Sequence, residues 1–152
     1  MESDVSLLLE NLKEQERISA RMLALSRQQY EASSDPVMNG DSILSQKARL
    51  VGELQMLISR ARLIEDDLAQ KFNLPEFTIN GLKGHVEEDV RCSLGLVAGQ
   101  VGILLKSIID ADAKTTELIQ SRLARIKGPQ VDATNSARAL QAYQNSTRWK
   151  RE

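Results

Sequence analysis

The chain has 152 residues, of which 20 are Lys or Arg and 21 are Asp or Glu, so its formal net charge is −1. Hydrophobic residues make up 41% of it and aromatic residues only 3%, which implies an aliphatic core. Three prolines and eight glycines are too few for a small all-β domain, which needs a turn roughly every ten residues. One Cys and one His exclude a disulfide framework and a Cys/His zinc site, and the absence of a basic surplus argues against nucleic-acid binding.

The first long helix is expected over residues 3–33. Ser3 or Asp4 can cap its start, and Pro36 ends it because a proline disfavours α geometry in the residue before it. The apolar stripe of this helix is incomplete. Polar residues stand where a continuous stripe would carry apolar ones: Gln15, Ser19 and Ser26.

The second helix is expected from Asp41 or Ser42 to Phe72, where Asn73-Leu74-Pro75 ends it. It carries the clearest pattern in the chain, because its stripe follows strict steps of four and three residues. This spacing keeps one side of a helix against a partner helix, as in a coiled coil. The stripe consists of Ile43, Lys47, Leu50, Leu54, Leu57, Ala61, Ile64 and Leu68.

The third helix is expected over Glu87–Lys127, after a connector at residues 76–84. Acidic residues open it, which suits the helix dipole, and Gly128-Pro129 ends it. The same spacing recurs and fades near Thr115. Its stripe consists of Val90, Leu94, Val97, Val101, Leu104, Ile108, Ala111, Thr115 and Leu118.

The last segment, residues 129–152, differs in composition from the bundle expected over residues 1–128. It is rich in Asn, Gln, Ser, Thr and Ala, and its net charge is +2. Ala137, Leu140 and Tyr143 would share one helical face, with Trp149 further on. The segment is too polar and too short to hold a helix alone, so we expect a disordered tail or a short amphipathic helix that docks on something.

Three glycines, Gly95, Gly99 and Gly102, form a strip of small residues in the third helix. A glycine inside a helix costs about 1 kcal/mol relative to Ala, so the strip indicates close approach by another helix or by a bulky side chain of a partner. It is a possible groove for a helix. The uncharged run between Arg91 and Lys106 is 14 residues long, shorter than the ~20 needed to span a membrane, so we expect no membrane insertion.

The residues with reactive side chains do not form a catalytic pattern. His85 invites comparison with phosphotransfer domains, but Lys83 and Gly84 precede it instead of following it, and we expect an ordinary position in the first helical turn. Cys92 is expected to be a small buried hydrophobic residue. Two acidic runs, Glu65-Asp66-Asp67 and Glu87-Glu88-Asp89, lack the spacing of a metal-binding loop. The sequence therefore favours a binding protein that is not an enzyme and needs no cofactor.

The second helix and its surroundings resemble the FlgN-type flagellar export chaperones. The resemblance rests on the Leu7-Leu8-Leu9-Glu10-Asn11-Leu12 start, the Gly40-Asp41 turn and the order of elements that follows. Within the second helix it rests on Leu44, Lys47, Leu50, Leu54 and Leu57, followed by Phe72-Asn73-Leu74. It covers most of residues 5–127. Asp110-Ala111-Asp112-Ala113 departs from the family, which tends to carry asparagines in this part of its third helix.

The resemblance implies a cytoplasmic chaperone that binds flagellar hook-associated (hook–filament junction) proteins before their export. It implies that the C-terminal segment binds an amphipathic helix at the end of the client, with Ala137, Leu140 and Tyr143 as candidate contacts. It also implies that a tyrosine of the tail, here Tyr143, contacts the cytoplasmic domain of the export-gate membrane protein. The opening Met-Glu-Ser-Asp-Val, which lacks the basic flank of a signal peptide, agrees with a cytoplasmic location.

Together these patterns predict an all-α protein, an antiparallel bundle of three long helices with coiled-coil-like packing and a short C-terminal helix or tail. The far end of the third helix, from Thr115, is expected to be exposed, packed by the tail or covered by a second subunit in a homodimer. Two other functions stay open: a non-catalytic helical adaptor or coiled-coil scaffold unrelated to flagella, and a phosphotransfer domain using His85.

Overall fold

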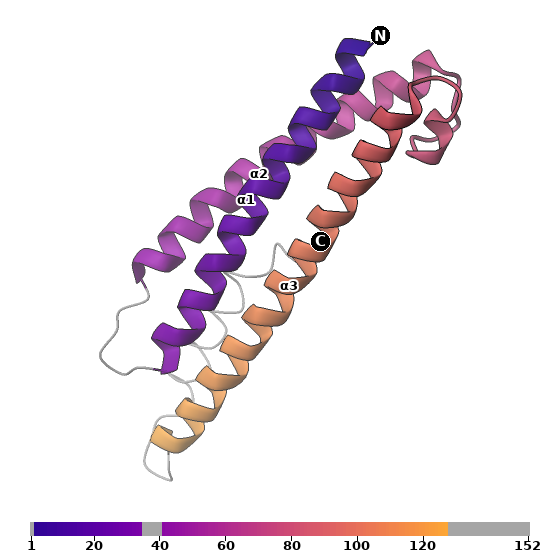
Figure 1. Ribbon diagram of the computed structural model, residues 1–152. Helices are drawn as coiled ribbons and strands as arrows, with labels where there is room; N and C mark the ends of the chain where they lie inside the picture. The colour runs from indigo at the N-terminus through magenta and orange to yellow at the C-terminus, as the bar shows by residue number, and fades with distance from the viewer. Residues whose placement is uncertain (1, 35–40, 128–152) are drawn as a thin grey trace. The chain divides into compact units, whose positions relative to one another are not determined.

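A computed structural model describes residues 2–34 and 41–127, which form three long α-helices (Figure 1). Helix α1 spans Glu2–Ser34, α2 spans Asp41–Lys71 and α3 spans Glu88–Lys127, with a short 3-10 turn, η1, at Asn80–Leu82. The described residues hold no β-strand, only an isolated bridge between Lys83 and Val86. The predicted all-α fold is confirmed, and each helix begins and ends within one or two residues of its expected bounds.

The heptad-like stripes face inward, as their spacing predicts. On α3 the buried apolar residues, Leu94, Val101 and Ile108, recur every seven positions. On α2 the stripe is buried at Lys47, Leu50, Leu54, Ala61 and Leu68. Helix α2 runs opposite to α1, and α3 runs opposite to α2 (Figure 1), which is the expected antiparallel arrangement.

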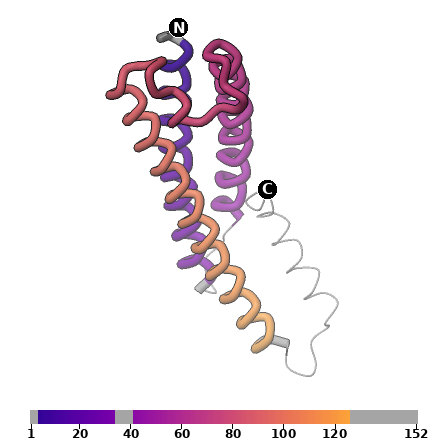
Figure 2. Tube along the Cα trace, turned by 90° about the vertical axis from the view of Figure 1, so that its right-hand side faces the viewer, coloured from indigo at the N-terminus to yellow at the C-terminus, as the bar shows by residue number. Residues whose placement is uncertain are grey.

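The end of α2 is closed by its backbone. The amide of Leu74 donates to the carbonyl of Ala69 at 2.8 Å, and Asn73 adopts a left-handed conformation with φ of 55°. This geometry satisfies carbonyls at a helix end, and asparagine tolerates it better than most residues. The connector that follows then turns back toward the helices (Figure 2).

Two compact units divide the described residues, and each helix contributes to both. The first unit holds residues 2–21 and 50–104, and its core is apolar. Buried side chains from α1, α2, η1 and α3 meet there: Val5, Leu8, Ala61, Leu68, Leu82 and Leu94. Partly buried residues of the connector, Phe72, Phe77, Ile79 and Val86, pack against this cluster and fix the start of α3.

The second unit holds residues 22–34, 41–49 and 105–127, and its core contains a buried ion pair. The ammonium of Lys47 donates to Asp112 Oδ1 at 2.8 Å and to Gln29 Oε1 at 2.9 Å, and both charged side chains are 6% exposed. One residue from each helix thus meets at this point. This contact explains why Lys47 stands in the otherwise apolar stripe of α2. The sequence did not predict it.

The buried side of α1 is as polar as its sequence indicates. Gln15, Ser19 and Ser26 are all buried. Within the first unit, Asn11 Nδ2 donates to the Leu57 carbonyl of α2 at 2.9 Å, and Gln15 Nε2 donates to Asn11 Oδ1 at 2.7 Å. The first bond ties α1 to α2 by a direction-specific contact in addition to aliphatic packing, and the second, within α1, holds the Asn11 side chain in place.

Candidate binding surfaces

The candidate client-binding residues Ala137, Leu140 and Tyr143, together with Trp149, lie outside the described residues. Their assignments, including Tyr143 as the gate contact, stay predictions. The surfaces that the described residues offer to a partner lie on the helices and the connector before α3.

A groove of about 490 Å³ lies between α1 and α2 in the first unit. Leu7 on α1 and Leu63 on α2 stand on its two sides, 52% and 66% exposed, over a floor that includes Leu57 and Ile64. Because water contacts both leucines, the groove offers apolar area that a partner can cover. Sequence reasoning missed it. The available signal was that Leu7 and Leu63 are large apolar residues off the buried stripes.

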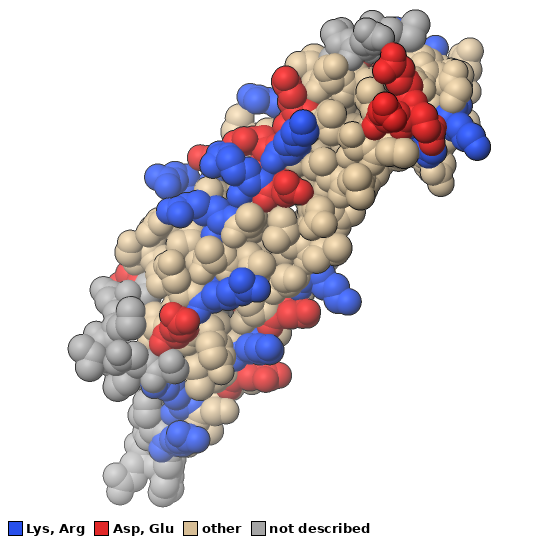
Figure 3. Space-filling view, viewed as in Figure 1, with Lys and Arg blue, Asp and Glu red and all other residues tan. Residues whose placement is uncertain are grey.

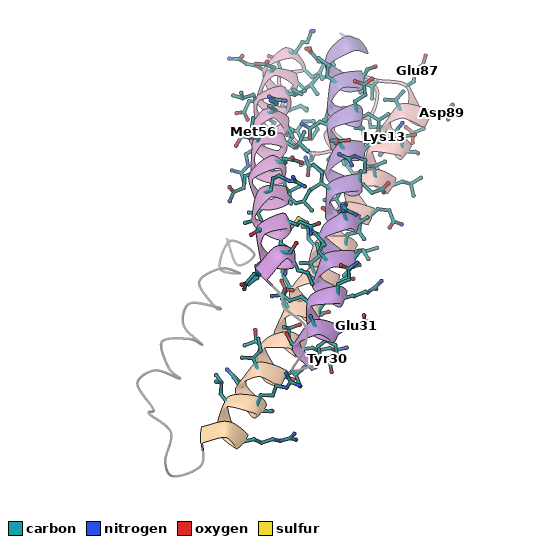
Figure 4. The ribbon with its side chains drawn as sticks, turned by 90° about the vertical axis from the view of Figure 1, so that its left-hand side faces the viewer. Lys13, Tyr30, Glu31, Met56, Glu87 and Asp89 are labelled. Atoms are coloured by element: carbon teal, nitrogen blue, oxygen red, sulfur yellow. The ribbon has the colours of Figure 1, made fainter. Side chains whose placement is uncertain are left out.

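The groove has a charged rim. Glu10 and Glu14 border it on α1 and Arg60 borders it on α2. Arg17 Nε lies 3.0 Å from each oxygen of Glu14, and this bond holds the pKa of the Glu14 carboxyl below its usual range. Seven residues before Leu63 on α2, Met56 is a further exposed apolar side chain. It is 58% exposed and lies on the outer side of the helix (Figure 4).

A second hollow, of about 730 Å³, lies at the start of α3 and is lined in part by Val5, Ser6, Phe72 and His85. The His85 ring stacks on Phe72 with centroids 4.6 Å apart. His85 precedes α3, which begins at Glu88, so the expected position in the first helical turn is wrong. The connector turns before it joins the helix, and it leaves this ring exposed on an aromatic neighbour.

The glycine strip faces away from the core. A side chain added at Gly95, Gly99 or Gly102 would meet no atom within 4 Å. Beside the strip, Leu96 is 71% exposed and Ile103 is 60% exposed. The sequence left open whether the strip packs within this chain or against a partner, and no other helix of the described residues packs closely on it.

Helix α3 is also, among the described residues, the one helix long and apolar enough to cross a membrane by length and composition. Only 17% of its most apolar stretch is buried. A core helix of a soluble protein can meet the same criterion. Three large apolar residues of α3 are exposed among the described residues: Leu96, Ile103 and Ile109.

The expectation for Cys92 is wrong, because its side chain is exposed. Its Sγ lies 3.9 Å from Glu88 Oε1, a weak contact one helical turn away. Across the residues that the structure describes, no group of three or more His, Cys, Asp or Glu side chains is placed to hold a metal ion.

Comparisons with protein-family models, with curated proteins and with solved structures found no match for this chain.

Proposed function

We propose that this protein is a cytoplasmic export chaperone that binds flagellar hook-associated proteins by their C-terminal helices and delivers them to the flagellar type III export gate. The resemblance of residues 5–127 to FlgN-type chaperones supports the class of client. The observation that carries the proposal is the groove between α1 and α2, where Leu7 and Leu63 stand exposed on its two sides.

A groove of this kind suits an amphipathic helix. The apolar side of such a helix would cover Leu7 and Leu63, and each fully buried leucine contributes about 1.5–3 kcal/mol. Glu10 and Arg60, on opposite rims, would favour a client helix with a basic flank on one side and an acidic flank on the other. Contacts of this size give reversible binding, which a chaperone that must release its client requires.

The tail supplies the second part of the proposal. Leu140 and Tyr143 would fold onto the client as a short helix, at a cost in ordering entropy that keeps the affinity moderate. Tyr143 would afterwards contact the cytoplasmic domain of the export-gate protein. In this scheme the groove and the tail hold the same client helix.

The test is calorimetric titration of the full chain with peptides from the C-termini of hook-associated proteins of the source organism. We expect saturable binding at micromolar affinity. Leu7→Glu with Leu63→Glu should weaken it about tenfold or more, and so should Leu140→Ala with Tyr143→Ala. Leu96→Glu with Ile103→Glu is the matched control, because it places the same two charges on exposed aliphatic residues of α3 and should leave peptide affinity unchanged.

Other results would show whether the groove, the tail or both bind the client helix. Binding that survives deletion of residues 129–152 but not the groove substitutions would remove the tail from the client site. Binding to none of these peptides, by a protein with unchanged helix content, would overturn the chaperone proposal. The alternative, a non-catalytic helical adaptor unrelated to flagella, would then be favoured by the uncovered surface of α3.

A further inference from the structure

One side of α3 carries an uncharged surface between residues 92 and 105. The exposed residues on it are mostly small or aliphatic: Cys92, Gly95, Leu96, Gly99, Gly102 and Ile103. We refer to these six residues as the α3 face. Figure 3 shows an uncharged surface over this part of α3, below the acidic side chains at the start of the helix.

We propose that the α3 face binds the same face of a second copy of this chain, so that two α3 helices pack antiparallel in a twofold-symmetric dimer. The three glycines lack side chains, and the space above them is open. A second helix can therefore approach closely, and the Leu96 and Ile103 side chains of each copy can cover the glycine backbone of the other. An isologous contact of this kind closes on itself as a dimer.

Charged residues at the two ends of the α3 face favour a second copy of this chain as the partner and favour an antiparallel orientation of its helix. Glu88 and Lys106 are both exposed, and because α3 is one continuous helix their separation of about five turns places them on the same side of it. An antiparallel pair that packs through the α3 face and crosses at the level of Val97 along the helix axis brings Glu88 of each copy opposite Lys106 of the other. A parallel pair would instead set like charges together, which disfavours it.

Glu88 can take part although it already pairs with Arg91 in its own helix. A carboxylate has two oxygens and can accept hydrogen bonds from two cations. Exposed ion pairs are individually weak, so this contact would fix orientation while the apolar residues supply most of the affinity. A lipid surface would gain nothing from the paired opposite charges, which is why we favour a second copy over a membrane.

With the two helices crossing at the level of Val97, Cys92 of one copy would lie opposite Gly102 of the partner subunit. Two Cys92 residues would stand about 15 Å apart along the helices, too far for a disulfide. We therefore expect the unaltered protein to stay unlinked on mild oxidation and the Gly102→Cys protein to form a disulfide-linked dimer. The matched control is Gly52→Cys on α2, an exposed glycine with the same open surroundings, which should not link.

Sedimentation equilibrium of the full chain gives the second readout. The unaltered protein should be a dimer at tens of micromolar. Leu96→Glu with Ile103→Glu should make it monomeric without loss of helix content. Glu88→Lys or Lys106→Glu alone should weaken dimerisation about tenfold or less, and the two charge reversals together should restore it.

Three results would overturn the proposal. One is a protein that stays monomeric at all concentrations, including a monomer that binds lipid vesicles through the α3 face and sediments with them. Another is a dimer that the paired glutamate substitutions leave intact. The third is a chain that dimerises only after residues 129–152 are deleted, which would identify the tail as the natural occupant of the face. Peptide titration with the Leu7 and Leu63 variants is independent of these results, so the chaperone proposal and this one can fail separately.

Discussion

Glu65 is a single carboxylate on α2 that opposes folding at neutral pH. It is half-buried, and burial raises its pKa above the usual range, with a further rise from the neighbouring charge of Asp66 and a smaller opposing effect of Arg62. A raised pKa in the folded state means that folding favours the protonated form. The contribution of Glu65 to stability is therefore complete below its unfolded pKa, about 4.3, and is lost as the pH rises through the folded value.

Replacing this carboxyl by an amide should remove the loss of stability at neutral pH. We expect Glu65→Gln to raise the melting temperature at pH 7 and to leave it unchanged near pH 4, because Glu65 is then largely protonated in both states. Thermal unfolding followed by circular dichroism at both pH values checks this. Glu117→Gln, at an exposed position on α3, is the control and should show no such pH-dependent gain. A gain of equal size at both pH values would contradict the assignment to ionisation.

At the scale of the helices, Lys47 and Asp112 show what a local pattern can and cannot reveal. The four-three spacing predicted that Lys47 lies on the buried side of α2, and it does. It could not predict the partner, because Asp112 stands one residue beyond the stripe position Ala111, on a helix distant in sequence. The acceptor on α1, Gln29, was equally hidden. Periodicity places a residue on a side of its own helix, whereas the contact depends on how three helices meet.

Removing one partner of the buried ion pair should destabilise the protein, whereas replacing both charged residues by apolar ones should not. Lys47→Met removes the cation that balances Asp112 in a buried site, and we expect a loss of about 3–5 kcal/mol in the free energy of unfolding. Lys47→Met with Asp112→Leu removes both charges and should be close to neutral, or more stable by up to about 4 kcal/mol. Urea denaturation of the four proteins of this double-mutant cycle provides the measurement. A double variant as unstable as the single one would mean that packing, not charge balance, determines the loss.

The candidate surfaces were harder to predict than the helices. The three glycines were singled out correctly as unusual, but their cost in a helix does not tell whether a neighbour lies inside or outside the chain. The groove between α1 and α2 escaped notice because Leu7 and Leu63 are ordinary helix residues until the two helices are placed side by side. Capping residues, prolines and glycines therefore predicted the helix bounds and periodicity predicted the buried sides, while the surfaces depend on tertiary arrangement.

At the scale of the whole molecule, the two compact units differ in the chemistry of their cores. Among the described residues, the buried set of the first unit comprises eleven apolar and three polar side chains, whereas that of the second comprises five of each. Apolar burial contributes about 25 cal/mol per Å², and a buried polar group contributes little net stability even when it is hydrogen-bonded. The second unit should therefore open more readily than the first.

Native-state hydrogen exchange read by mass spectrometry tests this difference, with rates corrected for the intrinsic exchange of each sequence. We expect amides of residues 54–69 and 90–104 to be the best protected, and those of residues 22–33 and 105–118 to exchange faster through local opening. Lys47→Met should accelerate exchange in the second set while it leaves the first set nearly unchanged. Replacing both charges, with Lys47→Met and Asp112→Leu, should slow exchange in the second set toward that of the first. Equal protection of both sets, accelerated together by Lys47→Met, would mean that the helices open only as one cooperative bundle. The difference in core composition would then have no consequence for local stability.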